Sequence, residues 1–404
     1  MDKQQNMALK MRHRGRMHQV PIFLGKMFRS FIYMSDWKMI PMAAVIAAMV
    51  SMVVRKDYFL TMEGTLKGSF AMTCVAIWNG CFNSIQVICR ERSIIKREHR
   101  SGMHVTAYVF SHMVYQALLC LAQTVTTLYV CHVCGVQFPA KGVMSPWFML
   151  DLTVTIFLIS YASDMVSLLV SAIAHTTTAA MTVMPFVLIF QLVFSGGIFT
   201  LPSWATHISD YTISNYGLKC LSAQADYNNQ PMVTGWSTLT KVENKEIPVS
   251  FTIGKVADIL STDNGLTTQL RATEIDLAEI VTDVAAGEGV TIPGTLRTLL
   301  EQIMPTTKFT VGQLIDTLTQ SDLMAQYRDT EISFTFKLKD VIDAVGRDEV
   351  KNAIQTQTAA TMYNASYVCD RETIQRYWLI LGAFVLLFAG ATIVVLEFID
   401  KDKR

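Results

Sequence analysis

The sequence predicts an all-α membrane protein: six transmembrane helices, an N-terminal interfacial elbow helix, and a mostly helical soluble outer domain inserted between the fifth and sixth helices. Three observations predict this fold class. Hydrophobic residues make up 51% of the 404 residues, and the mean hydropathy is +0.32. The apolar residues are grouped in runs long enough to cross a bilayer. One long polar and acidic stretch separates the last run from the others.

The membrane part is expected to begin with a cytoplasmic basic segment and elbow helix at residues 1–36. There, VPIFLGKMFRSFIY mixes apolar side chains with Lys26 and Arg29, a composition typical of a helix lying in the interface. Transmembrane helices 1 to 5 follow within 37–200, with a charged loop at 89–103 between the second and third. The six spans are placed at 37–54, 65–88, 107–130, 147–173, 179–199 and 377–398.

The rest of the chain is expected to lie mainly outside the bilayer. Glycine and proline near residue 200, followed by aromatic residues, predict an outer re-entrant or interfacial segment at 201–228. An extracytoplasmic inserted domain is expected at 229–372. The sixth transmembrane helix and a cytoplasmic tail complete the chain at 373–404.

The inserted domain contains a sequence motif that occurs three times. FTIGKVADIL begins at Phe251, FTVGQLIDTL at Phe309 and the looser FKLKDVIDAV at Phe336. In the second copy, Thr310 and Gln313 have the spacing of a helix capping box. We therefore expect each copy to begin a capped helix.

The charge distribution predicts the orientation in the membrane. Residues 1–38 carry eight Lys/Arg against two acids, and CRERSIIKREHRSG at 89–102 carries five against two. The tail at 399–404 carries three against two. These segments lie on one side of a six-span protein, which the positive-inside rule makes cytoplasmic. We expect a multi-pass protein of the cell membrane with cytoplasmic N- and C-termini and residues 201–372 extracytoplasmic.

Several function classes are excluded or disfavoured. The chain has no G-x-x-x-x-G-K-[ST] sequence, so we expect no ATP hydrolysis by this chain, no catalytic residue and no bound cofactor. Residues 198–372 carry 13 Lys/Arg against 22 Asp/Glu, which argues against nucleic acid as a partner. CHVC at Cys131 lacks the second ligand pair of a zinc site, so no metal is expected.

Two blocks of sequence resemble a known family. WNGCFNSIQVICRERSIIKREHRSGMHVTAYVFSHM resembles the second span and coupling loop of the G subfamily of ABC transporters. ISYASDMVSLLVSAIAHTTTAAMTVMPFVLIFQLVFSGGIF, with SWATHISDYTISNYGLKCLSAQ after it, resembles their fourth and fifth spans and outer segment. The resemblance covers about 18–228 and 373–400. It implies the permease half of a type-2 ABC exporter without its nucleotide-binding domain.

The resemblance also implies partners. A second permease copy would form a homodimer or a similar heterodimer in the lipid bilayer. Because the chain begins close to the elbow, we expect a separate ABC ATPase subunit, which would hold ATP and Mg. The charged loop is the expected contact with that subunit; the alternative is an ordinary solvated basic loop. The contact residues would be Arg90, Glu91, Arg92, Ile94, Ile95, Arg97 and Glu98.

The resemblance also implies a substrate cavity. The positions that line it in the family are occupied here by Asn79 and Phe82 in the second span and by Ile189 and Leu192 in the fifth. Packing between helices is the alternative role for these side chains. The family's outer gate matches Gly197 and Ile198, where glycine replaces a bulky side chain.

Asp164 and two cysteines stand apart from these sets. Asp164 falls deep in the fourth span, where a carboxylate must be paired or neutral. We expect it to face the protein interior, with proton coupling as an alternative role. Cys220 and Cys369 flank the inserted domain, and a disulfide between them would join its two ends.

The leading functional hypothesis is an ATP-driven exporter permease that moves an amphipathic cargo, such as a lipid, peptide or drug-like molecule, by alternating access as a dimer. The alternative is a membrane-anchored sensor or scaffold whose outer domain binds a ligand or an envelope component.

Overall fold

The chain divides into two compact units, which we describe separately. In the computed structural model the described residues are 15–33, 36–197, 202–244, 246–252, 274–276, 290–291, 308–310, 313 and 331–398. The first unit comprises residues 1–233 and 355–404, and the second comprises 234–354. The second unit is thus somewhat shorter than the inserted domain expected at 229–372.

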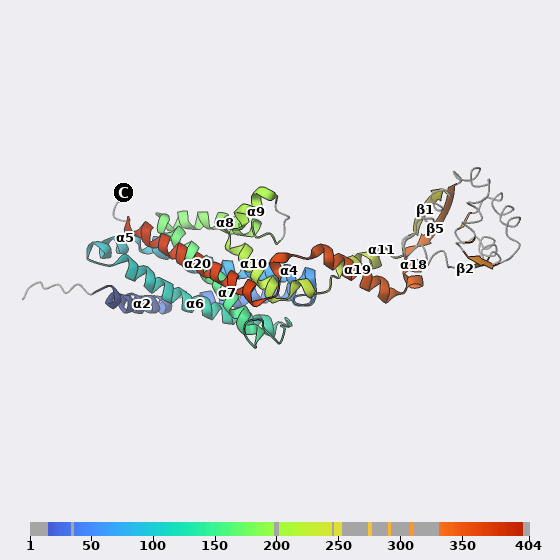
Figure 1. Cartoon of the computed structure of the whole chain (residues 1–404). Coiled ribbons are helices and arrows are strands. Elements are labelled where there is room, and N and C mark those ends of the chain that lie inside the picture. Colours follow the sequence, from blue (N-terminus) through green and yellow to red (C-terminus); the bar gives the residue numbers. More distant parts are fainter. Residues whose placement is uncertain are drawn as a thin grey trace, which may run out of the picture. The chain divides into compact units, whose positions relative to one another are not determined.

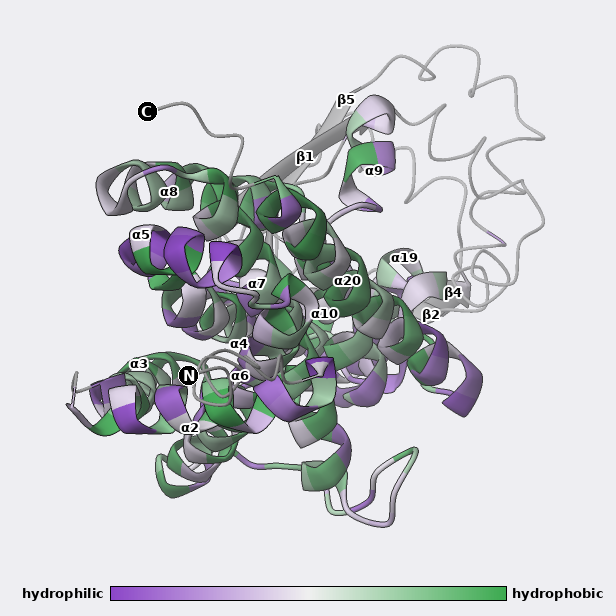
Figure 2. Ribbon diagram, turned by 90° about the vertical axis from the view of Figure 1, so that its left-hand side faces the viewer, coloured by the Kyte–Doolittle hydropathy of each residue, from purple (hydrophilic) through white to green (hydrophobic). Residues whose placement is uncertain are grey.

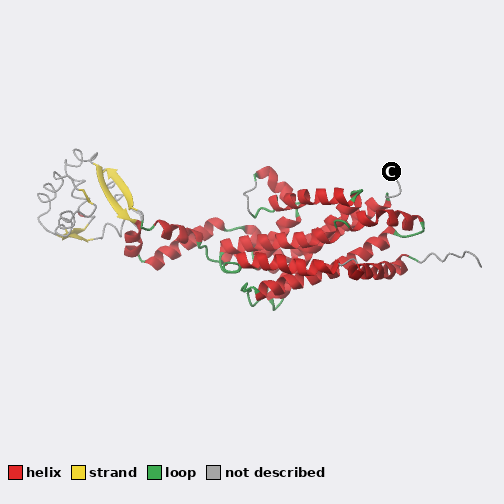
Figure 3. Cartoon of the chain, turned by 180° about the vertical axis from the view of Figure 1, so that it is seen from behind, coloured by secondary structure: helices red, strands yellow, loops and turns green. Residues whose placement is uncertain are grey.

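In its described residues the first unit consists of helices joined by loops, without strands (Figures 1 and 3). The first described helix, α2, is followed by long helices that run side by side (Figure 1). Its main helices are α2 (Arg16–Tyr33), α3 (Met39–Val54), α4 (Met62–Ser84), α5 (Val87–Arg100), α6 (Val105–Val133), α7 (Phe148–Ile173), α8 (Thr177–Val193), α10 (Ile213–Gln224) and α20 (Arg371–Glu397). Shorter helices are η1 (Asp36–Lys38), α9 (Ser203–Ser209), η2 (Tyr227–Asn229) and η3 (Ala365–Tyr367).

Five helical segments in the described part of the chain are long and apolar enough to cross a membrane. They are Asp36–Val54, Met62–Arg100, Val105–Val133, Phe148–Ile173 and Arg371–Glu397. Each matches one of the six expected spans. The remaining expected span corresponds to α8, an apolar helix of 17 residues. At 1.5 Å per residue α8 is about 25 Å long, slightly less than the hydrocarbon core.

Helix α7 lies at the centre of the bundle and packs against both α4 and α20. Its approach to α4 is very close at Gly80, where a Cβ atom would lie 2.0 Å from the Ser160 carbonyl oxygen. The apolar core around this contact includes Ile77, Ile159 and Leu168, which are fully buried. Small residues at a helix crossing allow such close packing within a membrane. In Figure 2 the residues of α8 and α20 are coloured mostly as hydrophobic.

Helix α10 is the main element of the segment expected at 201–228. It begins at Ile213 with Thr212 as N-cap, whose hydroxyl accepts from the Asn215 N–H at 3.4 Å. Most of its side chains are buried, and it packs against α4, α7 and α20. This part of the 201–228 segment is therefore a buried helix of the first unit.

The proposed disulfide is wrong in this structure, because all eight cysteines are free thiols. Cys220 is fully buried, with its Sγ 3.6 Å from the Thr155 hydroxyl, in a cluster with Ile374 and Tyr377. Burial raises the pKa of the Cys369 thiol to about 11, and the nearby Asp226 and Asp370 act in the same direction. A thiol protonated at neutral pH is a poor nucleophile for disulfide exchange.

The second unit contains β-sheet. Its strands are β1 (Glu246–Thr252), β2 (Glu274–Asp276), β3 (Val290–Thr291), β4 (Lys308–Thr310) and β5 (Glu331–Lys337). The order β1-β5-β3 forms an antiparallel sheet, and β2 pairs antiparallel with β4. Helices α11 (Thr234–Val242) and α18 (Leu338–Val345) flank β1 and β5 in the chain, and α19 (Arg347–Met362) follows.

The expectation of a mostly helical outer domain needs correction, because the described residues of the second unit include five strands. Phe251, Phe309 and Phe336 all lie in strands, near the C-terminal end of β1, β4 and β5. In the third copy a helix does begin as expected, because α18 starts at Leu338, two residues after Phe336. The capping box is confirmed: the Thr310 N–H donates to Gln313 Oε1 at 3.1 Å, and the Gln313 N–H donates to Thr310 Oγ1 at 3.2 Å.

Candidate coupling interface

Helix α5 is a separate amphipathic helix that follows α4 after a two-residue break. Its C-terminus is closed by a Schellman motif. The Met103 N–H donates to the Glu98 carbonyl at 3.0 Å, and the Gly102 N–H donates to the His99 carbonyl at 3.1 Å. Gly102 has φ +99°, a left-handed conformation that glycine adopts without steric cost. The Ser-Gly pair in the sequence therefore ends the helix at a defined point.

One face of α5 is anchored in the protein by Ile88, Cys89 and Ile95, of which the two isoleucines are fully buried. The Cys89 Sγ donates to the Ser171 carbonyl at 3.0 Å, and the Ile88 N–H donates to the Ser171 hydroxyl at 3.1 Å. These contacts attach the start of α5 to the end of α7.

Arg92 strengthens the attachment to α7. Its guanidinium donates to the carbonyl oxygens of Ala172 at 2.8 Å and Ala174 at 3.1 Å. Both carbonyls belong to the C-terminal end of α7, where peptide oxygens lack partners within the helix and the helix dipole is negative. Arg92 thus caps α7 from α5.

The two acidic residues of α5 are paired with Lys26 of the elbow helix α2. The Lys26 ammonium lies 2.9 Å from Glu91 Oε2 and 3.9 Å from Glu98 Oε1. Glu91 and Glu98 are seven residues apart and therefore lie on the same side of α5. All three side chains are partly shielded from solvent. We call this group, Lys26 with Glu91 and Glu98, the elbow clamp.

Gln19 makes a second connection between α2 and the loop that follows α5. Its Nε2 donates to the Gly102 carbonyl at 3.3 Å, and its Oε1 accepts from the His104 N–H at 2.9 Å. Gln19 and Lys26 are seven residues apart, so α2 holds both ends of α5 from one face. Edge-to-face aromatic pairs, including Phe23 with Tyr108, attach α2 to α6.

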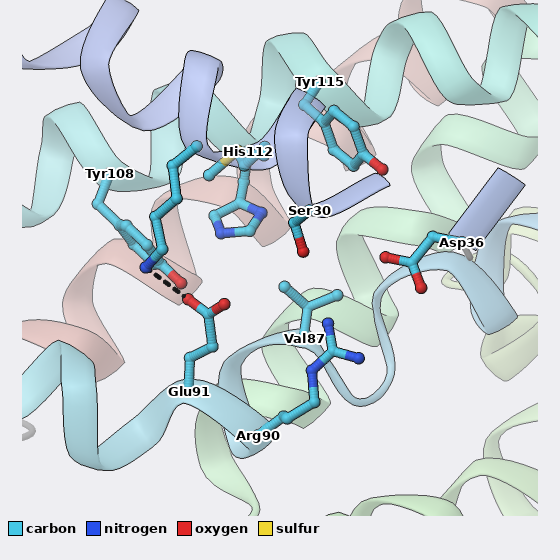
Figure 4. Close-up of a pocket in the computed structure, with 10 residues that line it drawn as sticks. Ser30, Asp36, Val87, Arg90, Glu91, Tyr108, His112 and Tyr115 are labelled. Carbon is cyan, nitrogen blue, oxygen red and sulfur yellow. Dashed lines mark hydrogen bonds and ion pairs between the residues drawn. The ribbon is translucent and has the colours of Figure 1, made fainter. Parts of the chain in front are cut away.

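A small cavity of about 40 Å³ lies beside the elbow clamp. Figure 4 shows Glu91, Tyr108 and His112 pointing into it from α5 and α6. Neither ring nitrogen of His112 has a hydrogen-bond partner among the described residues, and the ring is buried. The volume suffices for roughly two or three water molecules. Its walls supply the polar groups that such waters require.

The opposite face of α5 is exposed and basic. Arg90, Ser93, Arg97 and Arg100 are exposed and lie at helical spacing on one side. Figure 2 shows this end of the molecule as strongly hydrophilic at α5. The helix therefore exposes cations to solvent, while its acidic residues and isoleucines make contacts within the protein.

The geometry can now be compared with known proteins. Residues 18–223, which are about half of the chain, match the family described as ABC-2 type transporter. This chain belongs to the ABC-2 type transporter family. The predicted resemblance to the permease half of a type-2 ABC transporter is thereby confirmed. The family is a membrane component of ABC systems, which include an ATPase.

One relative is an ABC transporter ATP-binding/permease protein of Mycobacterium tuberculosis (strain ATCC 25618 / H37Rv). It is 32% identical over 126 residues, which cover 30% of this chain and 14% of the relative. The matched part is thus a small share of that longer protein.

Within this ABC-2 chain, the seven residues predicted to contact an ATPase fall on different faces of α5. Arg90 and Arg97 are exposed, and Ile94 is partly buried. Ile95 is fully buried, so its prediction as a surface contact is wrong. The remaining three are held in contacts within the chain: Glu91 and Glu98 with Lys26, and Arg92 with α7. Sequence reasoning missed the inner partners Gln19 and Lys26, because nothing in the sequence pairs positions 65 or more residues apart.

The predicted cavity residues lie on α4 and α8, which are in contact. Asn79 is buried, and the Phe82 ring packs edge-on against Trp78 with centroids 6.0 Å apart. Ile189 is 57% exposed and Leu192 is partly buried. Thus α4 contributes a shielded amide while α8 presents an apolar surface.

The predicted outer gate is described at one of its two positions. A Cβ atom on Gly197 would lie 2.9 Å from side-chain atoms of both Leu218 and Phe70. A larger side chain here would therefore displace the Leu218 and Phe70 side chains of α10 and α4. Ile198, the second predicted gate residue, lies outside the described residues.

Asp164 is fully buried in α7. The Ser84 side chain is a neighbouring polar group, and among the described residues neither carboxylate oxygen forms a direct hydrogen bond. The expectation that this side chain faces the protein interior is confirmed. A carboxyl group in this position is most stable in its neutral form, because an unpaired buried charge is very costly.

Proposed function

We propose that this chain is the permease subunit of an ATP-driven ABC exporter. It would work as a dimer with a second permease copy and move an amphipathic cargo by alternating access. Membership of the ABC-2 type transporter family supports this proposal, as do the apolar helices. An ABC ATPase that binds ATP and Mg would supply the energy from the cytoplasmic side. Positive charge near both termini supports cytoplasmic ends and an extracytoplasmic 201–372.

The observation that carries the proposal is the two-sided construction of α5. One face is attached to α7 through Arg92 and to α2 through the elbow clamp. The other face is exposed and cationic. A force applied to the outer face would therefore move α5 together with the bundle. This is the property required of a helix that receives motion from an ATPase.

The docking surface we propose is the exposed face, comprising Arg90, Ser93, Arg97 and Arg100. It excludes Glu91 and Glu98, because both acidic residues are paired with Lys26 of the same chain. An acidic groove on the ATPase would match this surface, because complementary charge steers association.

For the cargo path we propose the surface formed by Asn79 and Phe82 on α4 with Ile189 and Leu192 on α8. The exposed Phe186 and Ile189, at 70% and 57%, extend the apolar strip along α8. Such a strip suits either cargo or a second permease copy. Between two copies it would enclose a largely apolar cavity with one amide, that of Asn79, from each copy.

The docking surface is tested with the complex of this chain and its ATPase. Arg97→Glu reverses one exposed charge without breaking a described contact, so the chain should fold normally. We expect co-purification of the ATPase to fall about tenfold, within the range measured for opposed interface charges. Lys141→Glu, an exposed change in the loop between α6 and α7, is the matched control.

Unchanged ATPase recovery with Arg97→Glu and with Arg90→Glu would contradict docking through this face. Full function of the chain with no ATPase bound would contradict the exporter proposal itself and favour a membrane-anchored sensor or scaffold.

A further inference from the structure

A second cavity, unrelated to the elbow clamp, lies where the start of α2, the first part of α6 and the end of α20 meet. Its volume is about 310 Å³, a size typical of small-molecule sites. We call it the elbow groove. It is lined by Arg16, Met17, Val20, Thr106, Ala107, Phe110, Met113 and Ile393.

The walls of the elbow groove are held by defined contacts. The Ser111 hydroxyl of α6 lies 3.2 Å from the Val20 carbonyl of α2, and Phe23 packs edge-on against Tyr108 at 5.7 Å. Gln19 fixes the preceding turn of α2 to the loop before α6. The groove is therefore set by the packing of α2 on α6.

The lining is chemically asymmetric. Arg16 is exposed at the start of α2 and is the only charged residue among those that line the groove. Thr106 stands near the start of α6, and Met113 lies seven residues further, about 10 Å along the helix axis. Between them the lining is apolar. The groove thus joins a cation at its rim to an apolar channel that runs along α6.

The charged residues in the sequence that precedes Arg16 are mostly basic. Residues 1–15, which precede Arg16, contain four Lys/Arg and one Asp in the sequence. On the proposed orientation this end of the molecule meets the cytoplasmic leaflet, whose anionic lipids attract basic segments beside a membrane. A phosphate at Arg16 and an acyl chain along Phe110 and Met113 would match both parts of the lining.

We propose that the elbow groove binds one anionic phospholipid, with its headgroup at Arg16 and part of an acyl chain between α2, α6 and α20. This lipid site goes beyond the proposed transport function. It rests on one part of that proposal, the orientation of the chain with its termini on the cytoplasmic side. Because α2 also carries the elbow clamp, the lipid would stabilise the helix that holds α5.

The test uses the full-length chain, purified in detergent, and native mass spectrometry with added dioleoyl phosphatidylglycerol or dioleoyl phosphatidylcholine. The wild type should retain phosphatidylglycerol preferentially, at one tight site. Arg16→Gln should weaken phosphatidylglycerol binding about fivefold, the effect of one cation near a charged lipid, and leave phosphatidylcholine unchanged. Thr106→Phe should fill the groove and weaken both lipids.

Arg29→Gln is the matched control, because Arg29 is exposed on the same helix and does not line the groove. Equal losses with Arg16→Gln and Arg29→Gln would overturn the proposal in favour of diffuse surface charge. Equal retention of the two lipids by the wild type would also overturn it. Arg16→Gln alters an exposed side chain, so its result stands if Thr106→Phe fails to fold. No ATPase is present, so failure here is distinguishable from failure of the exporter proposal.

Discussion

Lys26 has a central position, because one ammonium group lies close to the two carboxylates of α5. Its distances of 2.9 Å to Glu91 and 3.9 Å to Glu98 make the first the stronger contact. The pairs are partly exposed, so each contributes about 0.2–1 kcal/mol to stability. The importance of the clamp therefore lies in where it holds α5 rather than in its contribution to unfolding.

Asp164 allows a prediction about a buried acid. Asp164→Asn preserves the shape and neutrality of the protonated side chain, so we expect expression and thermal stability in detergent close to the wild type. Asp164→Lys places an unpaired cation there and should prevent folding, because insertion of such a charge costs roughly 2.5–3.5 kcal/mol.

If Asp164→Asn is as unstable as Asp164→Lys, the neutral-acid account is wrong. If Asp164→Asn folds but transport alone is lost, the ionisable proton has a role in the mechanism, as the proton-coupling alternative requires.

Asp370 gives a pH-dependent prediction at the start of α20. Its Oδ1 accepts from the Thr373 N–H at 2.6 Å, and the Thr373 side chain and backbone hold the pKa of Asp370 below its ordinary value. A lowered pKa in the folded state stabilises the protein above the unfolded pKa of about 3.9 and loses that effect as pH falls through the folded value.

Asp370→Asn keeps a good N-cap but does not titrate. The loss of melting temperature between pH 5 and pH 3 should therefore be smaller in Asp370→Asn than in the wild type. Glu372→Gln, in the same turn, controls for general loss of negative charge. Identical acid profiles for Asp370→Asn and the wild type would refute the role of this cap.

At the scale of elements, the α4–α7 crossing depends on Gly80. Adding a methyl group 2.0 Å from the Ser160 carbonyl forces the two helices apart. We expect Gly80→Ala to lower the unfolding free energy by about 1–3 kcal/mol, the usual range for overpacking. The measurement is thermal unfolding of the detergent-solubilised chain.

Gly390→Ala is the matched control for Gly80→Ala. Gly390 is a helical glycine in α20, and a Cβ atom there would meet nothing within 4 Å. The control should be neutral or stabilising, by up to about 1 kcal/mol. Equal destabilisation by the two changes would show that the crossing does not need a glycine.

Most helices of the first unit follow from apolar runs and capping residues, which act locally and are visible in sequence. The strands of the second unit were missed although a local signal exists. Ile247, Val249 and Phe251 alternate with other residues in β1, and Ile332, Phe334 and Phe336 do so in β5. The register pairs Ile247 with Phe336, Val249 with Phe334 and Phe251 with Ile332. The apolar positions after each Phe also fit the period of a helix, and they favour a helical prediction over this period of two.

At the scale of the whole molecule, the ABC-2 type could be predicted because the charged loop and the fifth-span block are continuous in sequence. The arrangement of the coupling interface could not. Which face of α5 is buried depends on Lys26 and on the end of α7, and both are distant in the chain. Similarly, only the folded chain shows that Gly197 fits between Phe70 and Leu218.

The central claim is that α5 passes motion from an ATPase to the membrane helices through its inner contacts. The most direct measurement is the ATP-dependent change in amide hydrogen exchange of α2 and α6, in the complex with the ATPase. The wild type should show the change, Lys26→Glu should lose most of it, and Lys26→Glu with Glu91→Lys should recover it. An undiminished change in Lys26→Glu, with the ATPase still bound, would contradict the claim.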